Sequence, residues 1–172
     1  MEPLELVERL AAARIGRTYN QYAGSELRRG RLYAHLATRA DAQVVLVGEA
    51  AGYRGARVSG VPFTSERQLT GSGPAEATAT IVQCTLAELE LEDGVLLWNV
   101  VPTHPGTATA NRRPTCAEVA AARPFLDAVT GGRCVVAVGR LAAEALETQY
   151  VRHPSHGGAA AFADGLRRTL GR

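Results

Sequence analysis

Three short apolar runs, at 44–47, 94–99 and 134–138, constrain the fold of this chain more than any other feature. The first run contains only Val and Leu and ends at Gly48. Such continuous runs are typical of strands that are buried on both faces of a parallel sheet. A shorter run at 150–152 leads into His153 and is predicted to add a fourth strand.

Helical patterns separate these strands along the chain. We predict helices at 3–14, 25–39, 79–91, 115–129, 139–146 and 157–170. Ser25 is a suitable N-cap, and Thr115 with Glu118 forms a capping-box pattern. Strands that alternate with helices imply parallel pairing through right-handed crossovers. The predicted fold class is therefore α/β, a three-layer α/β/α sandwich with a four-stranded parallel sheet.

The length of 172 residues fits one domain, with N-terminal helices at 3–39 and a motif-bearing core at about 43–170. Hydrophobic residues make up 46% of the chain, which is enough for a core. The first residues lack the pattern of a signal peptide, and no apolar run approaches the ~20 residues that span a membrane. We expect a cytoplasmic monomer that does not associate with membranes.

The three cysteines, Cys84, Cys116 and Cys134, are far apart, and none belongs to a Cys-x-x-Cys pair. Zinc sites and iron–sulfur clusters normally need four ligands, often at close spacing. We interpret these cysteines as reduced core or helix residues, and we predict neither a metal site nor an organic cofactor.

The ends of the predicted strands indicate where a ligand would bind. In parallel sheets, ligands bind outside the carboxyl ends of the strands. These ends carry Gly48, Glu49, Asn99, Gly139 and His153. Two long polar loops, 52–78 and 102–114, leave from the same edge, and long ordered loops are usually functional. The sequence therefore predicts one pocket at this edge.

Several common catalytic motifs are missing from the sequence. It contains no Walker A motif, no Gly-x-Gly-x-x-Gly after the first strand, no Gly-x-Ser-x-Gly and no His-Glu-x-x-His. These absences disfavour P-loop nucleotide chemistry, dinucleotide redox chemistry, serine hydrolysis and zinc proteolysis.

Several other motifs occur in a characteristic order: Gly-Glu-Ala-Ala-Gly at 48–52, Gly-Val-Pro-Phe at 60–63, Leu-Leu-Trp-Asn-Val-Val-Pro at 96–102, Asn-Arg-Arg-Pro-Thr at 111–115 and His-Pro-Ser at 153–155. Over roughly 43–170 the chain resembles the uracil-DNA glycosylase superfamily, nearest to the branch whose first motif begins Gly-Glu-Ala-Pro-Gly. It departs from that branch at Ala51, which replaces the proline. It also lacks the cluster cysteines of that branch, so we expect no iron–sulfur cluster.

The resemblance assigns base recognition to Asn99 and Phe63. An Asn amide can accept from uracil N3–H and donate to O4 at once, whereas cytosine presents the reverse pattern. Each mispaired group would cost roughly 1–3 kcal/mol. Phe63 would stack on a base flipped out of DNA. The alternatives are an Asn that bonds local backbone and a Phe that anchors its loop.

The resemblance assigns catalysis to His153 and Glu49. A neutral His153 would donate to base O2, where negative charge develops as the glycosidic bond breaks. Glu49 would orient or deprotonate the attacking water and balance the positive sugar. In the best-studied branch the catalytic Asp aligns with Ala50, so Glu49 as a structural carboxylate remains an alternative. The backbone of Gly48 and Ala50 would line the base pocket in either case.

One position bears on the choice of base. The best-studied branch has a bulky Tyr, which excludes the thymine methyl, where this chain has Gly52. Because Gly leaves room, we expect weaker discrimination against thymine unless Tyr53 takes over this role.

The basic residues suit a DNA partner. The net charge is only +2, and all 19 basic residues are Arg. Those near the site are expected to form an electrostatic footprint for DNA: Arg54, Arg57, Arg112, Arg113 and Arg152. Ser155, Gly157 and Gly158 are expected to donate hydrogen bonds to DNA phosphates, and His156 could touch DNA. His104 could also touch DNA, whereas His35 is interpreted as structural.

We therefore expect a monofunctional DNA glycosylase that flips out uracil and leaves an abasic site, with DNA containing uracil or another deaminated base as its partner. Glycosylases that also cut the strand usually do so through a lysine Schiff base, and this chain has no Lys. Two alternatives remain. One is a glycosylase for hypoxanthine or xanthine. The other is a non-catalytic nucleic-acid-binding relative, which Ala50 and Ala51 would allow.

Overall fold

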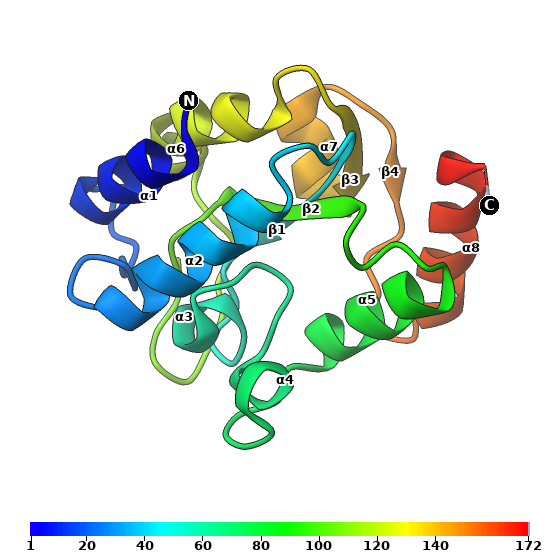
Figure 1. Cartoon of the computed structure of the whole chain (residues 1–172), viewed down its shortest axis with the longest axis horizontal. Coiled ribbons are helices and arrows are strands. Elements are labelled where there is room, and N and C mark those ends of the chain that lie inside the picture. Colours follow the sequence, from blue (N-terminus) through cyan, green and yellow to red (C-terminus); the bar gives the residue numbers. More distant parts are fainter. Residues whose placement is uncertain (172) are drawn as a thin grey trace.

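The computed structural model describes residues 1–171, and its centre is a parallel sheet of four strands (Figure 1). The strands are β1 (Val44–Ala50), β2 (Val95–Val101), β3 (Cys134–Val138) and β4 (Tyr150–Val151). Their order in the sheet is β2-β1-β3-β4, and every pairing is parallel. Helices cover both faces of the sheet, so the predicted α/β fold class is confirmed.

Eight helices accompany the sheet in the described residues: α1 (Pro3–Ala12), α2 (Glu26–Thr38), α3 (Ala56–Ser59), α4 (Glu66–Thr70), α5 (Ala77–Glu88), α6 (Cys116–Thr130), α7 (Arg140–Leu146) and α8 (Ala159–Leu170). Six of them correspond to the predicted helices. The predicted caps are present: the Ser25 side chain accepts from the Arg28 backbone N–H, and Thr115 and Glu118 form a reciprocal capping box.

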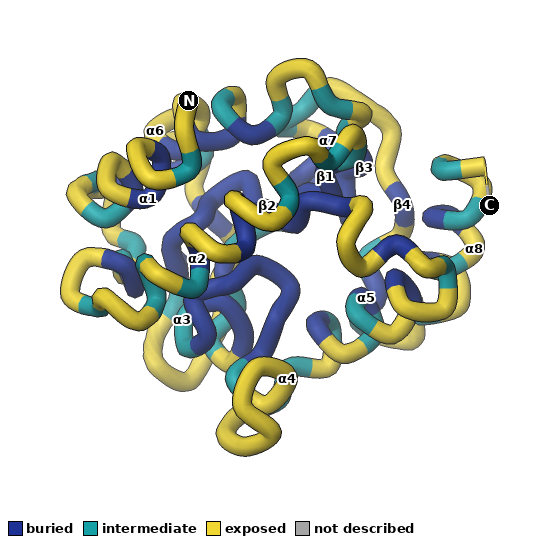
Figure 2. Tube along the Cα trace, viewed as in Figure 1, coloured by how far each residue is buried: buried dark blue, intermediate teal, exposed yellow. Residues whose placement is uncertain are grey.

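Two apolar clusters lie on opposite faces of the sheet. On one face, α1, α2, α6 and α7 pack over Val45, Val47 and Trp98. On the other, α5 and α8 pack over Leu46 and Leu97. Figure 2 shows the strands buried between helices whose outer surfaces are exposed. Because successive strand residues point to opposite faces, Val45, Leu46 and Val47 of β1 are buried alternately in the two clusters, and Val44 and Ala50 are partly buried against them.

The structure corrects two predicted boundaries near the site. Strands β1 and β2 are longer than predicted, since Gly48 pairs with Asn99 and Ala50 pairs with Val101. Glu49 and Asn99 therefore lie inside strands. The loop at 52–78 contains α3 and α4, where we predicted irregular structure. Ser65 caps α4, and Gly71 ends it in a left-handed conformation.

The three cysteines were interpreted as core or helix residues. Cys84 and Cys116 lie on helices α5 and α6, whereas Cys134 begins β3, and all three are exposed, so none belongs to the core. His35 is buried, with its Nε2 3.0 Å from the Leu97 carbonyl oxygen, as expected for a structural histidine.

No helix within residues 1–171 is both long and apolar enough to cross a membrane.

Candidate active site

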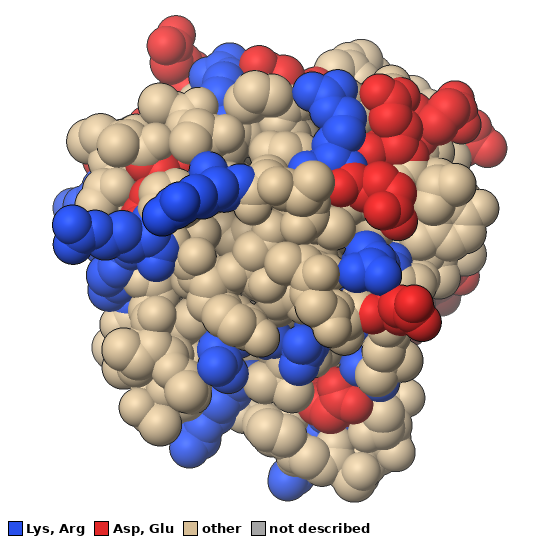
Figure 3. Space-filling model, turned by 90° about the vertical axis from the view of Figure 1, so that its left-hand side faces the viewer, with Lys and Arg blue, Asp and Glu red and all other residues tan. Residues whose placement is uncertain are grey.

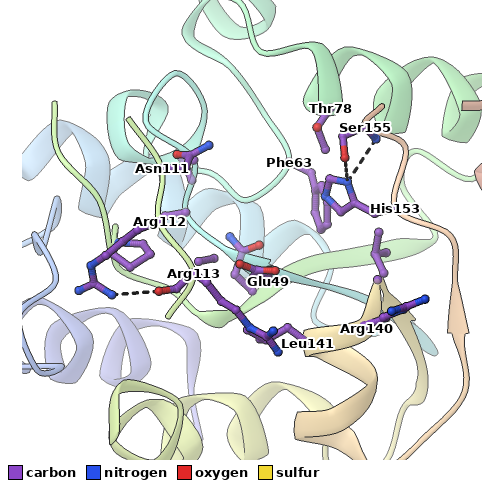
Figure 4. A pocket seen from close by; sticks show the side chains of 18 of the residues that line it. Glu49, Phe63, Thr78, Asn111, Arg112, Arg113, Arg140, Leu141, His153 and Ser155 are labelled. Carbon is purple, nitrogen blue, oxygen red and sulfur yellow. Dashed lines mark hydrogen bonds between the residues drawn. The ribbon is translucent and has the colours of Figure 1, made fainter. Parts of the chain in front are cut away.

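A pocket of about 620 Å³ opens at the carboxyl ends of the strands (Figure 4). Elements that are far apart in the sequence contribute to it: the end of β1, the loop after it, β2, the loop at 102–114, α7 and the loop after β4. Eleven of the residues predicted for the site line this one pocket: Glu49, Ala50, Gly52, Phe63, Asn99, Arg112, Arg113, Gly139, His153, Ser155 and His156.

One end of the pocket is built around Gly48. Gly48 lies directly opposite Asn99 in the sheet, and a Cβ on it would lie 2.9 Å from Asn99 Oδ1 and overlap the Phe63 ring. Glycine is therefore required here, because only its bare backbone lets the aromatic ring and the amide approach each other. Phe63 has a φ of 50°, which is unusual for a non-glycine residue.

The side chain of Asn99 is available for a ligand. The residue is only 4% exposed, yet within residues 1–171 its amide makes no hydrogen bond to other protein groups. The alternative in which Asn99 bonds local backbone does not occur. Buried amides are normally paired, so an unpaired one on a pocket wall is suited to recognise a bound polar group.

The tautomer of His153 follows from its contacts. The backbone N–H of Ser155 donates to His153 Nδ1 at 3.2 Å, and the Ser155 hydroxyl lies 2.8 Å from the same nitrogen (Figure 4). Because Nδ1 accepts, the proton of the neutral ring is on Nε2. Burial lowers the pKa of His153, and the nearby His156 lowers it further. The residue is therefore a neutral N–H donor at pH 7.

Glu49 lies on the other face of β1 from Gly48 and Asn99. It follows Val45 and Val47, which belong to the cluster on that side of the sheet. Burial raises the pKa of Glu49, while the positive charge of Arg113 opposes this shift and Glu144 adds to it. Arg113 itself donates to Glu144 at 2.9 Å and lies beside Glu49 in Figure 4.

The loop at 102–114 is held in place by a buried carboxylate. Arg112 donates to both oxygens of Glu118, at 2.8 and 2.6 Å. Backbone N–H groups of Arg17 and Thr115 also donate to Glu118, at 3.3 and 2.9 Å. These bonds, the one from Arg112 above all, lower the pKa of Glu118 to about 2. Arg112 thus has a structural partner, although we expected it to serve the DNA footprint.

His104 does not reach the surface. It is fully buried, with Nδ1 2.7 Å from the Ala51 carbonyl oxygen and Nε2 2.7 Å from that of Thr107. The suggestion that it touches DNA was wrong, because it joins the loop at 102–114 to the chain after β1.

Seven further predicted residues do not line the pocket: Gly48, Tyr53, Arg54, Arg57, Arg152, Gly157 and Gly158. The guanidinium of exposed Arg54 lies 5.4 Å from the centre of the Tyr53 ring, and that of Arg57 lies 4.8 Å from the centre of the Tyr19 ring. Figure 3 shows basic side chains spread over one face of the molecule, with acidic side chains concentrated at its upper right.

Several pocket residues were not predicted from the sequence. Glu76, Thr78, Arg140 and Glu144 line the pocket from the end of the loop at 52–78, from the start of α5 and from α7. Asn111 also lines it, and its side chain accepts from the Tyr53 backbone N–H at 2.9 Å. Asn111 had a sequence signal, since it belongs to the Asn-Arg-Arg-Pro-Thr motif.

The space beside Gly52 is not open, contrary to our expectation. A Cβ on Gly52 would overlap the carboxyl of Glu76. Glu76 therefore occupies the volume that a side chain at position 52 would need.

No group of three or more side chains within residues 1–171 is arranged to ligate a metal ion.

Comparisons with known proteins agree with this architecture. The crystal structure of wild-type SMUG2 from Pedobacter heparinus has a similar fold, with a TM-score of 0.73 over 99% of this chain and 97% of that chain. The two sequences are 12% identical, so this likeness shows the fold alone. No curated protein sequence matches the chain. The sequence model of the Uracil DNA glycosylase superfamily matches residues 36–165, which is most of the chain. The protein therefore belongs to the uracil DNA glycosylase superfamily.

Proposed function

We propose that the protein is a monofunctional DNA glycosylase that removes uracil from DNA. Membership of the superfamily supports a DNA glycosylase, and the choice of uracil rests on the pocket. The observation that carries it is the unpaired amide of Asn99, which lines the pocket with Phe63 and lies beside the bare backbone of Gly48. This amide can accept from N3–H and donate to O4 of uracil, a pattern that cytosine does not present.

In the proposed reaction, a flipped uracil enters the pocket and stacks on Phe63. The bond between N1 of the base and C1′ of the sugar breaks, and its electron pair goes to the base. His153 donates from Nε2 to base O2, where the negative charge gathers, and because the ring is already neutral, it keeps its proton.

Water completes the proposed reaction. Glu49 orients a water molecule toward C1′ and accepts its proton, while its negative charge stabilises the positive sugar. The oxygen of this water bonds to C1′, and the proton passes to the uracil anion. The products are free uracil and an abasic site. The partly buried position of Glu49 suits this role, since burial raises its pKa and makes it a better base than an exposed Glu.

The strand itself would stay intact in this reaction. Strand cleavage by a glycosylase usually needs a Lys that forms a Schiff base with the sugar, and the chain has no Lys. We expect no DNA adduct after treatment with borohydride. A trapped adduct through a side-chain amine would contradict the proposal.

Excision assays test the proposed function. Oligonucleotides with one U, hypoxanthine, xanthine or T are incubated with the protein and then treated with alkali, which cuts abasic sites. We expect scission at U, and loss of it in His153→Gln. Scission at hypoxanthine or xanthine alone would instead select a purine glycosylase. Salt-sensitive binding without any scission would indicate a non-catalytic relative.

A further inference from the structure

Glu76 occupies a specific place in the pocket that the reaction above does not use. The residue directly precedes α5, and its carboxyl lies against the backbone of Gly52 and Gly55. A Cβ on either glycine would overlap this carboxyl. The two glycines therefore form a bare stretch of backbone on which the Glu76 side chain rests, and Glu76 supplies the pocket surface there.

The carboxyl of Glu76 has no partner that would explain it as a structural group. Its oxygens form no hydrogen bond and no ion pair within residues 1–171, and burial raises its pKa. By contrast, Glu118 accepts four hydrogen bonds and Glu66 pairs with Arg31 at 2.8 Å. A partly buried, uncompensated carboxyl costs stability and indicates a role in the pocket.

We propose that Glu76 is a specificity-determining residue that forms the wall against the C5–C6 edge of the bound base and excludes bases with a substituent at C5. This inference rests on the proposed function. A flipped uracil presents three edges in its plane. Asn99 takes the edge with N3 and O4, and His153 takes O2 beside the sugar. The edge that remains carries C5 and C6. Among the polar pocket side chains without a role in the reaction, Asn111, Arg140 and Glu144 are bonded to other residues. Glu76 and Thr78 are left, and of these two Glu76 rests on the backbone of Gly52 and Gly55.

The physical effect is steric with an added polar penalty. Because the Glu76 carboxyl already lies against the backbone of Gly52 and Gly55, it cannot retreat in that direction when a larger base enters. A methyl or hydroxymethyl group at C5 would have to displace it. An apolar methyl would also remove the remaining water from an unpaired carboxyl. One additional methyl or methylene group typically changes discrimination by about 10–200-fold.

The test compares variants at position 76 on matched substrates. Oligonucleotides with uracil, thymine or 5-hydroxymethyluracil, single-stranded and opposite guanine, are assayed for excision and for binding by fluorescence anisotropy. Glu76→Ala removes the wall, Glu76→Asp shortens it, and Glu76→Gln keeps its size but removes its charge. Glu92→Ala, an exposed residue in the turn before β2, is the matched control. Circular dichroism checks that each variant is folded.

We expect the wild type, Glu92→Ala and Glu76→Gln to prefer uracil. In Glu76→Ala, the ratio of thymine or 5-hydroxymethyluracil excision to uracil excision should rise at least about tenfold, with a smaller rise in Glu76→Asp. An unchanged ratio in Glu76→Ala would overturn the inference, and so would a wild type that excises thymine as fast as uracil. If Glu76→Ala fails to fold, an unchanged ratio in Glu76→Asp would overturn it as well.

Binding separates this inference from the proposed function. A wild type that excises no base would refute the glycosylase proposal. Even then, the ratio of Kd values for uracil and thymine oligonucleotides would show whether Glu76 limits the size of the bound base. A change of that ratio in Glu76→Ala would support Glu76 as the size limit of a binding pocket, whereas an unchanged ratio would refute this role.

Discussion

At the scale of single residues, the chemistry of the pocket depends on a side chain without a hydrogen-bond partner and on a histidine that is held in one tautomer. The Asn99 amide makes no hydrogen bond to the described protein, and the bare backbone of Gly48 gives it room beside Phe63. His153 is fixed in its Nε2–H form by the Ser155 backbone. Small substitutions at these positions should therefore change selectivity and pH dependence while leaving the fold intact.

Asn99→Asp should relax the rejection of cytosine. A carboxylate loses the N–H that donates to uracil O4 but can accept from the amino group of cytosine. We expect uracil excision to fall by about 10–100-fold, which corresponds to roughly 1–3 kcal/mol, and cytosine excision to become measurable. Asn99→Ala is the control, since it loses uracil contacts without gaining any to cytosine. Unchanged selectivity in Asn99→Asp would remove this residue from base recognition.

The pH profile should report the protonation of His153. Burial and His156 lower its pKa below 6.5, so the neutral donor persists into mildly acidic solution and is lost as the pH falls through this lowered value. His156→Gln removes one cause of the shift, so the pKa of His153 should rise. The acid limb of kcat/KM should then move to higher pH. NMR titration of His153 provides an independent measurement. An acid limb that stays in place would show that His156 does not influence the reaction.

At the scale of elements, the site depends on how loops are tied to the sheet and helices. The loop at 102–114 is joined to the start of α6 through Arg112 and Glu118 and to the chain after β1 through His104. The start of α6 therefore has two roles, since Glu118 of its capping box helps to begin the helix and also anchors a pocket loop.

Glu118→Gln should destabilise the protein by about 2–3 kcal/mol at pH 7, because it breaks a buried, hydrogen-bonded ion pair whose Arg side is partly exposed. The folded pKa of about 2 lies below the ordinary 4.5. The contribution of Glu118 is thus complete above pH 4.5 and is lost as the pH falls from there toward 2. Urea unfolding at several pH values measures it.

A matched control exists on the same helix. Asp127→Asn breaks an ion pair with Arg123 in which both side chains are more than half exposed, at 56% and 55%. Exposed pairs contribute little, so we expect a change below about 1 kcal/mol. If the two variants were equally destabilised at pH 7, or if the effect of Glu118→Gln did not shrink in acid, the anchoring role of Glu118 would be refuted.

At the scale of the whole molecule, DNA binding should depend on charges spread around the pocket. Arg54 is exposed and has no acidic partner within residues 1–171, whereas Arg113 is paired with Glu144 beside the pocket. A long anionic partner would meet several such residues at once, and its affinity would fall steeply with salt.

Arg54→Gln should weaken binding to all DNA sequences alike and reduce the slope of log K against log salt by about 1. The ratio of affinities for uracil-containing and ordinary oligonucleotides should stay the same, because a phosphate contact carries no base information. Arg168→Gln, an exposed residue near the end of α8, serves as the control. Equal salt slopes for wild type and Arg54→Gln would exclude Arg54 from the DNA interface.

The sequence by itself determined the fold class and much of the site. The apolar runs predicted three strands, the caps at Ser25 and Thr115 predicted two helix starts, and the motifs selected Asn99 and His153 at one edge of the sheet. These features are local or periodic, so they can be read along the chain. Parallel topology then places strand ends together without further information.

Only the tertiary structure decided which side chains share the pocket, which of them are buried and which residues they pair with. It placed Glu49 and Asn99 on opposite faces of the sheet, buried His104, paired Arg112 with Glu118 and filled the space beside Gly52 with Glu76. The physical reason is that each of these outcomes depends on contacts between residues distant in sequence. Neither the strand register nor the partner of a loop side chain leaves a periodic signal in the sequence.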